Sequence, residues 1–118
     1  MHTTITVAVT DETVATHDGT GTATSSIPIN GLVYRVDFDF GAAQTGTLDT
    51  TCKTAGNNGI AASIVAAIGN SATDATAFPL VNSNLAPFIM NDYAVVVLAQ
   101  ADNETEAAKV TIYWEPIQ

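Results

Sequence analysis

The sequence predicts an all-β protein, an antiparallel β-sandwich or jelly-roll-like fold with seven to eight short strands. Three observations lead to this prediction. Residues 32–40 alternate apolar and polar side chains, the Asn30-Gly31 pair before them is a strong signal for a tight hairpin turn, and turn residues recur at short intervals. With 118 residues, the chain fits a single domain, residues 1–118, which is long enough to bury a core.

Residues 32–40 form the best-defined strand. Successive side chains of an extended chain point to opposite faces, so this segment has two faces of different character. One face carries Leu32, Tyr34, Val36, Phe38 and Phe40, and the other carries Val33, Arg35, Asp37 and Asp39. We expect the first face to be buried and the second to meet water.

Two further strands are predicted before this one. Residues 3–9 place Ile5, Val7 and Val9 on one face and form an opening strand, so residues 1–12 are either an N-terminal arm or an edge strand. Residues 22–29 approach the Asn30-Gly31 turn as a strand. Pro28 indicates an edge position or a strand end, because proline cannot donate a ladder hydrogen bond.

Two elements follow the long strand. Residues 47–54 form an unusually polar strand with Leu48 and Cys52 as its inward side chains. The apolar spacing of residues 60–68 fits a strand and a short helix equally well. The short run and its flanking glycines favour the strand.

Residues 69–92 are predicted to form a long connection, broken by Pro79 and Pro87. A connection with so many apolar residues must pack on its own core or on a neighbouring subunit. Candidates for this packing are Phe78, Leu80, Val81, Leu85, Phe88, Ile89 and Met90.

Two strands close the chain. Residues 93–99 are apolar on both faces and indicate a central strand that is covered on both sides. Residues 107–114 alternate and are expected to pair with residues 93–99 as an antiparallel hairpin, ending at Pro116. Tyr113 and Trp114 point to opposite faces, so one is expected in the core and the other as an exposed contact.

The net charge of −9 makes nucleic acid and anionic membranes poor partners. The cations Arg35, Lys53 and Lys109 are far apart in sequence and form no basic cluster. The N-terminus lacks the pattern of a secretory signal and no apolar run is long enough to span a bilayer, so we expect synthesis in the cytoplasm. The Asn103 sequon is then a chance match.

Candidate catalytic residues are few. Cys52 is the only cysteine and is expected in the core; His2 and His17 lie in polar surroundings, so a Cys-His nucleophile pair is not predicted. Asp37 and Asp39 share a strand face at a spacing that glycoside hydrolysis can use, but a solvated strand face beside Arg35 is the favoured interpretation.

Ligand-binding motifs are equally weak. Asp102, Asn103, Glu104 and Glu106 could offer oxygen ligands to calcium, yet their spacing lacks the calcium-loop pattern and favours a solvated hairpin tip. The glycines of residues 19–21 and 41–46 lack the lysine and helix of a phosphate loop. We therefore predict no catalytic, cofactor-binding or metal-binding residues, no cofactor, and a protein that is not an enzyme.

Across about residues 27–115, the order of features resembles small β-sandwich virion proteins of tailed bacteriophages, most of all capsid decoration (cement) proteins. The resemblance lies in the strand at residues 31–40, the Thr-rich strand at 45–54, and the loop with Pro79 and the Pro87-Phe88 step. It continues in the apolar strand at 93–99 and the closing Lys-Val-Thr-Ile-Tyr-Trp strand at 109–114.

This resemblance implies a non-enzymatic structural protein on the exterior of the capsid. Its partner would be the major capsid protein, and it would be a homo-oligomer, with a trimer favoured. Alternatives are a neck, tail or fibre-associated protein, or a carbohydrate-binding or adhesin β-sandwich. The carbohydrate-binding alternative would need an exposed row of aromatic residues, which is not evident from an aromatic content of 7%.

Overall fold

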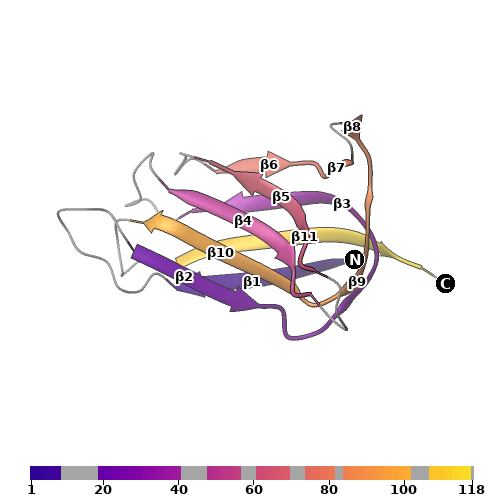
Figure 1. Ribbon diagram of the computed structural model, residues 1–118, viewed down its shortest axis with the longest axis horizontal. Helices are drawn as coiled ribbons and strands as arrows, with labels where there is room; N and C mark the ends of the chain where they lie inside the picture. The colour runs from indigo at the N-terminus through magenta and orange to yellow at the C-terminus, as the bar shows by residue number, and fades with distance from the viewer. Residues whose placement is uncertain are drawn as a thin grey trace.

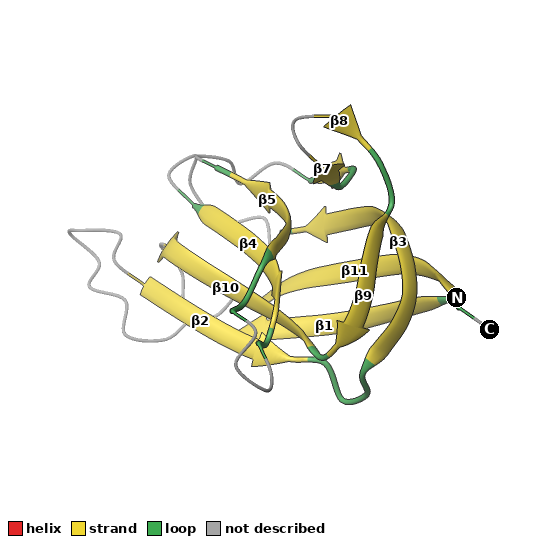
Figure 2. Ribbon diagram, turned by 45° about the vertical axis from the view of Figure 1, so that its right-hand side comes forward, coloured by secondary structure: helices red, strands yellow, loops and turns green. Residues whose placement is uncertain are grey.

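The computed structural model describes residues 1–8, 19–40, 48–56, 61–69, 74–81, 84–101 and 107–117, and these residues form two antiparallel β-sheets packed face to face (Figures 1 and 2). No helix occurs among them, so none could cross a membrane. The all-β sandwich predicted from the sequence is confirmed.

The larger sheet has the order β1-β11-β3-β6, with β9 also paired to β3. Its strands are β1 (His2–Ala8), β3 (Ile29–Asp39), β6 (Ala75–Ala77), β9 (Phe88–Asp92) and β11 (Ala107–Pro116). The smaller sheet has the order β2-β10-β4-β5, from β2 (Gly19–Thr24), β4 (Asp49–Thr54), β5 (Ile64–Ile68) and β10 (Ala94–Ala101). β7 (Leu80–Val81) and β8 (Asn84–Leu85) pair only with each other.

The chain crosses repeatedly from one sheet to the other, and the strand orders are those of an eight-position jelly roll. β6 and β9 lie end to end along β3, so that nine strands occupy eight positions. This is one strand more than the upper end of the predicted range. β1 is an edge strand of this sheet, held to β11 along its whole length.

The core lies between the sheets and comes from both. Its fully buried large side chains include Ile29, Val36, Phe38, Leu48, Met90, Val96, Leu98, Val110 and Ile112. Trp114 is also in the core, where its indole Nε1 donates a hydrogen bond to Thr3 Oγ1 at 3.2 Å, while Tyr113 points outward. The predicted division between these two aromatic residues is confirmed.

The predicted faces of residues 32–40 are correct only in their second half. Val36, Phe38 and Phe40 are buried as predicted, but before them Val33 is buried and Leu32 and Tyr34 are exposed. The register between β3 and β11 shifts between Val33 and Arg35, so Tyr34 and Arg35 both face outward. Such a β-bulge adds one residue to a strand and exchanges its faces from that point on.

The Asn30-Gly31 pair does not form a turn; this prediction was wrong. Both residues lie within β3, and the connection from β2 runs through residues 25–28 instead. Ser25 organises that connection, because its Oγ donates to the Ile27 carbonyl oxygen at 2.7 Å and accepts from the Ala94 amide at 3.1 Å. Glycine is required at position 31 for close approach, since a Cβ there would collide with the carbonyl oxygen of Glu115 and the ring of Trp114.

The strand prediction for residues 47–54 is confirmed by β4, with Leu48 and Cys52 buried. The ambiguity over residues 60–68 is resolved as a strand over Ile64–Ile68, while residues 57–60 lie outside the described part of the chain. A register shift against β4 buries both Val65 and Ala66 and leaves Ile64 exposed.

β10 and β11 are not a hairpin, contrary to prediction. β10 is central in the smaller sheet and β11 pairs with β1 and β3 in the larger one, so the two strands lie in different sheets. The outer side chains of β10, Val95 and Val97, are only half-buried, so the strand is not fully covered on both faces. The alternation of β11 and its end at Pro116 are as predicted.

Residues 69–92 were predicted to be a connection, but they contain four strands. β6 and β9 both extend the larger sheet beside β3, and the β7–β8 hairpin separates them. Met90 is buried in the core and Phe88 packs against it, so part of the apolar content serves the sandwich itself.

Replacing Gly31 by alanine tests the close approach of β3 to β11. We expect Gly31→Ala to lower the free energy of unfolding by about 3 kcal/mol, because the added methyl group meets backbone atoms that cannot move aside. Urea unfolding followed by tryptophan fluorescence measures this. The matched control is Gly69→Ala, whose Cβ would lie 3.5 Å from Asp49 Oδ1. Equal stability of the two variants would contradict the packing described here.

Replacing Thr50 tests the one buried side-chain oxygen that has no hydrogen-bond partner within the described residues. Thr50→Val has nearly the same shape and removes the uncompensated desolvation of the hydroxyl group. We expect it to raise the free energy of unfolding by about 1 kcal/mol. The exposed Thr24→Val variant serves as control, and a loss of stability in Thr50→Val would mean that the hydroxyl group does have a partner.

Candidate functional site

Five exposed residues form an apolar strip on the outer face of the larger sheet, where β3 meets β6 and β9. The apolar strip comprises Leu32, Tyr34, Phe78, Pro87 and Ile89. Leu32 and Ile89 face each other across the β3–β9 ladder and have exposed fractions of 37% and 70%. Tyr34 and Phe78, with 41% and 53%, continue the strip along β3 and past the end of β6.

Two prolines account for the interruption beside β3. β6 pairs with β3 as far as Val36, and β9 pairs with it from Val33, so Tyr34 and Arg35 have no partner from either strand. Pro79 and Pro87 stand at the two ends of this break, and proline has no N–H to offer a neighbouring strand.

The chain between the two prolines leaves the sheet as the β7–β8 hairpin, which projects beyond the sandwich at the top of Figure 2. The Ala86 amide donates to the Pro79 carbonyl oxygen at 3.2 Å and closes the base of the hairpin. A two-stranded hairpin without a third strand is only marginally stable in water. Cover from another molecule would therefore favour its folded form.

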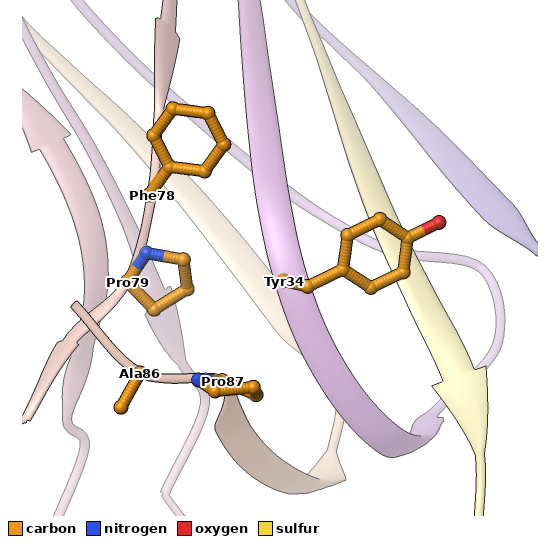
Figure 3. A pocket seen from close by; sticks show the side chains of 5 residues that line it. All are labelled: Tyr34, Phe78, Pro79, Ala86 and Pro87. Atoms are coloured by element: carbon orange, nitrogen blue, oxygen red, sulfur yellow. The ribbon is translucent and has the colours of Figure 1, made fainter.

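A small pocket of about 210 Å³ lies at the base of the hairpin, lined by Tyr34, Phe78, Pro79, Ala86 and Pro87 (Figure 3). The ring of Tyr34 is directed toward β11, and the other four residues stand on the opposite side of the pocket. Sites for drug-sized ligands usually measure about 300–1,000 Å³. This pocket therefore suits a single apolar side chain better than a cofactor.

Phe78 also borders a second hollow of about 360 Å³ on the side of β5, together with Ile64 and Ala77. Ile64 is 64% exposed. Apolar surface thus continues from the strip around the open edge of the sandwich, between β5 and β6.

A polar network lies beside the strip on the same face. The Arg35 guanidinium donates to both carboxylate oxygens of Asp37, with Nε and Nη2 each at 2.8 Å, and Thr76 Oγ1 donates to Asp37 at 2.8 Å. These hydrogen bonds, that of Arg35 first, hold the pKa of Asp37 below 3.8. Arg35 also stacks over the ring of Tyr113, 4.9 Å from its centroid.

Three rings form a row across three neighbouring strands, which the composition did not predict. The centroid of Tyr113 on β11 lies 6.0 Å from that of His2 on β1 and 6.5 Å from that of Tyr34 on β3. Cross-strand ring contacts of this kind stabilise a sheet. The row reaches the apolar strip at Tyr34.

The carboxylate pair considered for glycoside hydrolysis lies on one outer face, as predicted. Asp37 is occupied by Arg35 and Thr76, and its lowered pKa keeps it ionised at neutral pH, which is the opposite of what a general acid requires. Asp39 is exposed and borders a shallow hollow with Asp74 and Thr76. The geometry therefore favours a structural role for Asp37.

The other candidate residues do not meet in a site. Burial raises the pKa of the Cys52 thiol to about 12, so it stays protonated. Cys52 is on β4 of the smaller sheet, whereas His2 is on β1 of the larger sheet, within the aromatic row. Gly19 and Gly21 belong to β2 and are buried within the sandwich. Within the described residues, no group of three or more His, Cys, Asp or Glu side chains could hold a metal ion.

Several candidates fall outside the described part of the chain. These are His17, the glycines of residues 41–46, and the possible calcium ligands Asp102, Asn103, Glu104 and Glu106.

Sequence reasoning placed Phe78 and Ile89 in a segment that needs cover, but it missed Leu32 and Tyr34 because it assigned the faces of β3 without the bulge. A signal was present in the adjacent apolar pairs Leu32-Val33 and Phe88-Ile89, since one residue of each pair must face outward in a strand. Pro79 and Pro87 were interpreted as loop residues. In the structure they mark the point where β6 ends and, eight residues later, the point where β9 begins beside the same strand β3.

The Arg35–Asp37 pair predicts a specific pH dependence of stability. Because the folded pKa of Asp37 lies below its unfolded value, the pair contributes fully above about pH 4 and the contribution is lost as the pH falls through the folded pKa. Asp37→Asn should lower stability at pH 7 by up to about 1 kcal/mol, as is usual for exposed pairs. Below the folded pKa the variant should match the wild type.

Urea titrations between pH 2 and pH 7 test this, with Asp39→Asn as the control on the same strand face. A stability difference between wild type and Asp37→Asn that is constant with pH would show that the pair is not responsible.

Comparisons with protein-family models, curated proteins and solved structures gave no match for this chain. Its function must therefore be argued from the surface of the sandwich.

Proposed function

We propose that this chain is a non-enzymatic virion structural protein of a tailed bacteriophage, a decoration protein that binds the outside of the capsid and stabilises it. The observation that carries the proposal is the apolar strip together with the projecting β7–β8 hairpin. Leu32, Phe78 and Ile89 remain in contact with water although the fold has a well-filled core, and such patches typically mark protein–protein contacts.

The mechanism is stabilisation by mass action. A protein that binds only the assembled shell adds its binding free energy to the stability of that shell. A jelly roll suits this role because its two sheets hold the binding surface in a fixed shape, which limits the conformational entropy lost on docking.

Fold alone does not select this function, since jelly rolls serve both in virion proteins and in lectins. The resemblance over residues 27–115 to phage decoration proteins supports the virion assignment. A neck, tail or fibre-associated protein would use the same kind of surface and is the nearest alternative.

Carbohydrate binding is a second candidate, and the aromatic row favours it. Tyr34, Tyr113 and His2 cross three strands on one open sheet face, and sugars can stack on exposed rings. The guanidinium of Arg35 already covers the ring of Tyr113, which reduces the free stacking surface. Decoration therefore remains the better-supported function.

The test is co-sedimentation of the purified chain with empty shells assembled from the major capsid protein of the phage that encodes it. We expect saturable binding and a rise in the thermal midpoint of the shells as the chain is added. Free capsid subunits that have not assembled serve as the control and should not bind.

Light scattering on the same preparation measures self-association against the 12.2 kDa of one chain, for which a trimer is expected. Absence of shell binding, combined with binding on a glycan array, would reject decoration and establish the second candidate.

A further inference from the structure

We propose that the apolar strip docks on a partner surface that has an apolar centre and a rim of lysine and arginine side chains, and that this partner is the shell rather than a second copy. The inference rests on the proposed function and deepens it by naming the contact surface and the chemistry of its partner.

The centre of the contact follows from the strip itself. Leu32 and Ile89 form an exposed cross-strand pair, and the pocket between Tyr34 and Phe78 is lined only by apolar and aromatic side chains. Binding energy in protein interfaces concentrates on such central apolar anchors and the pockets that receive them. A single apolar side chain of the partner fits the pocket of about 210 Å³.

The rim of the contact carries negative charge. Glu115 is exposed and lies opposite Leu32 in the β3–β11 register, and Asp39 and Asp74 stand farther along the same face beside a shallow hollow. Three described cations lie on or beside this face. Arg35 is held by Asp37, Lys109 lies opposite Asp39 in the β3–β11 register, and the Met1 ammonium group donates to the Trp114 carbonyl oxygen at 3.0 Å, next to Glu115. With Asp37, four described carboxylates face these three cations, and a partner with basic side chains at its rim would complement the remaining negative charge.

The overall charge decides between the two possible occupants. Each chain carries a net charge of −9, so docking two copies strip to strip would bring like charges together at this face, and the expected trimer would form through another surface. A basic partner instead gains from the same field, both in its rate of encounter and in the complementarity of its rim.

Charged substitutions in the strip test the centre. Ile89→Asp and Phe78→Asp should each weaken binding to assembled shells by about 30-fold, the effect of losing one strong interface anchor. Both side chains are mostly exposed, so the urea midpoint should stay close to that of the wild type. The matched control is Ile27→Asp, which changes another exposed isoleucine, with an exposed fraction of 51%, in the connection before β3.

Charge reversal at the rim tests the chemistry of the partner. Raising NaCl from about 50 to about 500 mM should weaken wild-type binding about tenfold, because rim charges are screened. Glu115→Lys should weaken binding by about fivefold at the lower salt and much less at the higher salt. The control Asp49→Lys makes the same change of charge on β4, in the smaller sheet.

The outcomes separate this inference from the proposed function. If the wild type does not bind shells at either salt concentration, both are rejected. If it binds but Ile89→Asp and Phe78→Asp bind equally well, the function stands and the strip is not the contact. Binding that does not change with salt or with Glu115→Lys rejects the basic rim. Self-association that Ile89→Asp abolishes would make a second copy the occupant.

Discussion

The irregular point in β3 at Tyr34 and Arg35 determines most of what this surface can do. On one side β3 carries a bulge against β11, and on the other side β6 stops and β9 has not yet begun. Both irregularities fall at the same two residues, so the strand can exchange its faces there without breaking the sheet. The sandwich keeps Val33 and Val36 in its core and turns Leu32 and Tyr34 outward.

The sequence was sufficient for the fold class because period-two alternation is a local property of each strand. It predicted the opening strand, β4 with Leu48 and Cys52 inside, and the alternation of β11, all of which depend only on neighbouring residues. It failed for Asn30-Gly31, where glycine serves a close approach to Glu115 rather than a turn. A contact between residues 84 positions apart leaves no local signal.

The apolar strip likewise depends on contacts between residues far apart in sequence rather than on local alternation. A short acidic segment separates β10 from β11 in the sequence, which usually indicates a hairpin, but the two strands belong to different sheets. β6 and β9 are short and separated in sequence, so nothing in the sequence suggests that they lie end to end. Only their pairing with the same strand, β3, shows that they fill one position in the sheet. That arrangement brings Leu32 and Tyr34 beside Phe78 and Ile89, so the strip as a whole could not be recognised before the topology was known.

The strands that carry the apolar strip are paired within the sheet, and this pairing affects how the strip can bind a partner. Leu32 and Tyr34 sit on a strand that is paired with β11, and Ile89 on a strand that is paired with β3, so their backbone is already ordered before any partner arrives. Little conformational entropy remains to be lost at these positions on docking. The β7–β8 hairpin differs, because its two short strands have no other neighbour. A partner would therefore meet a rigid apolar centre with one adaptable element at its edge, which suits docking on a surface whose own shape is fixed.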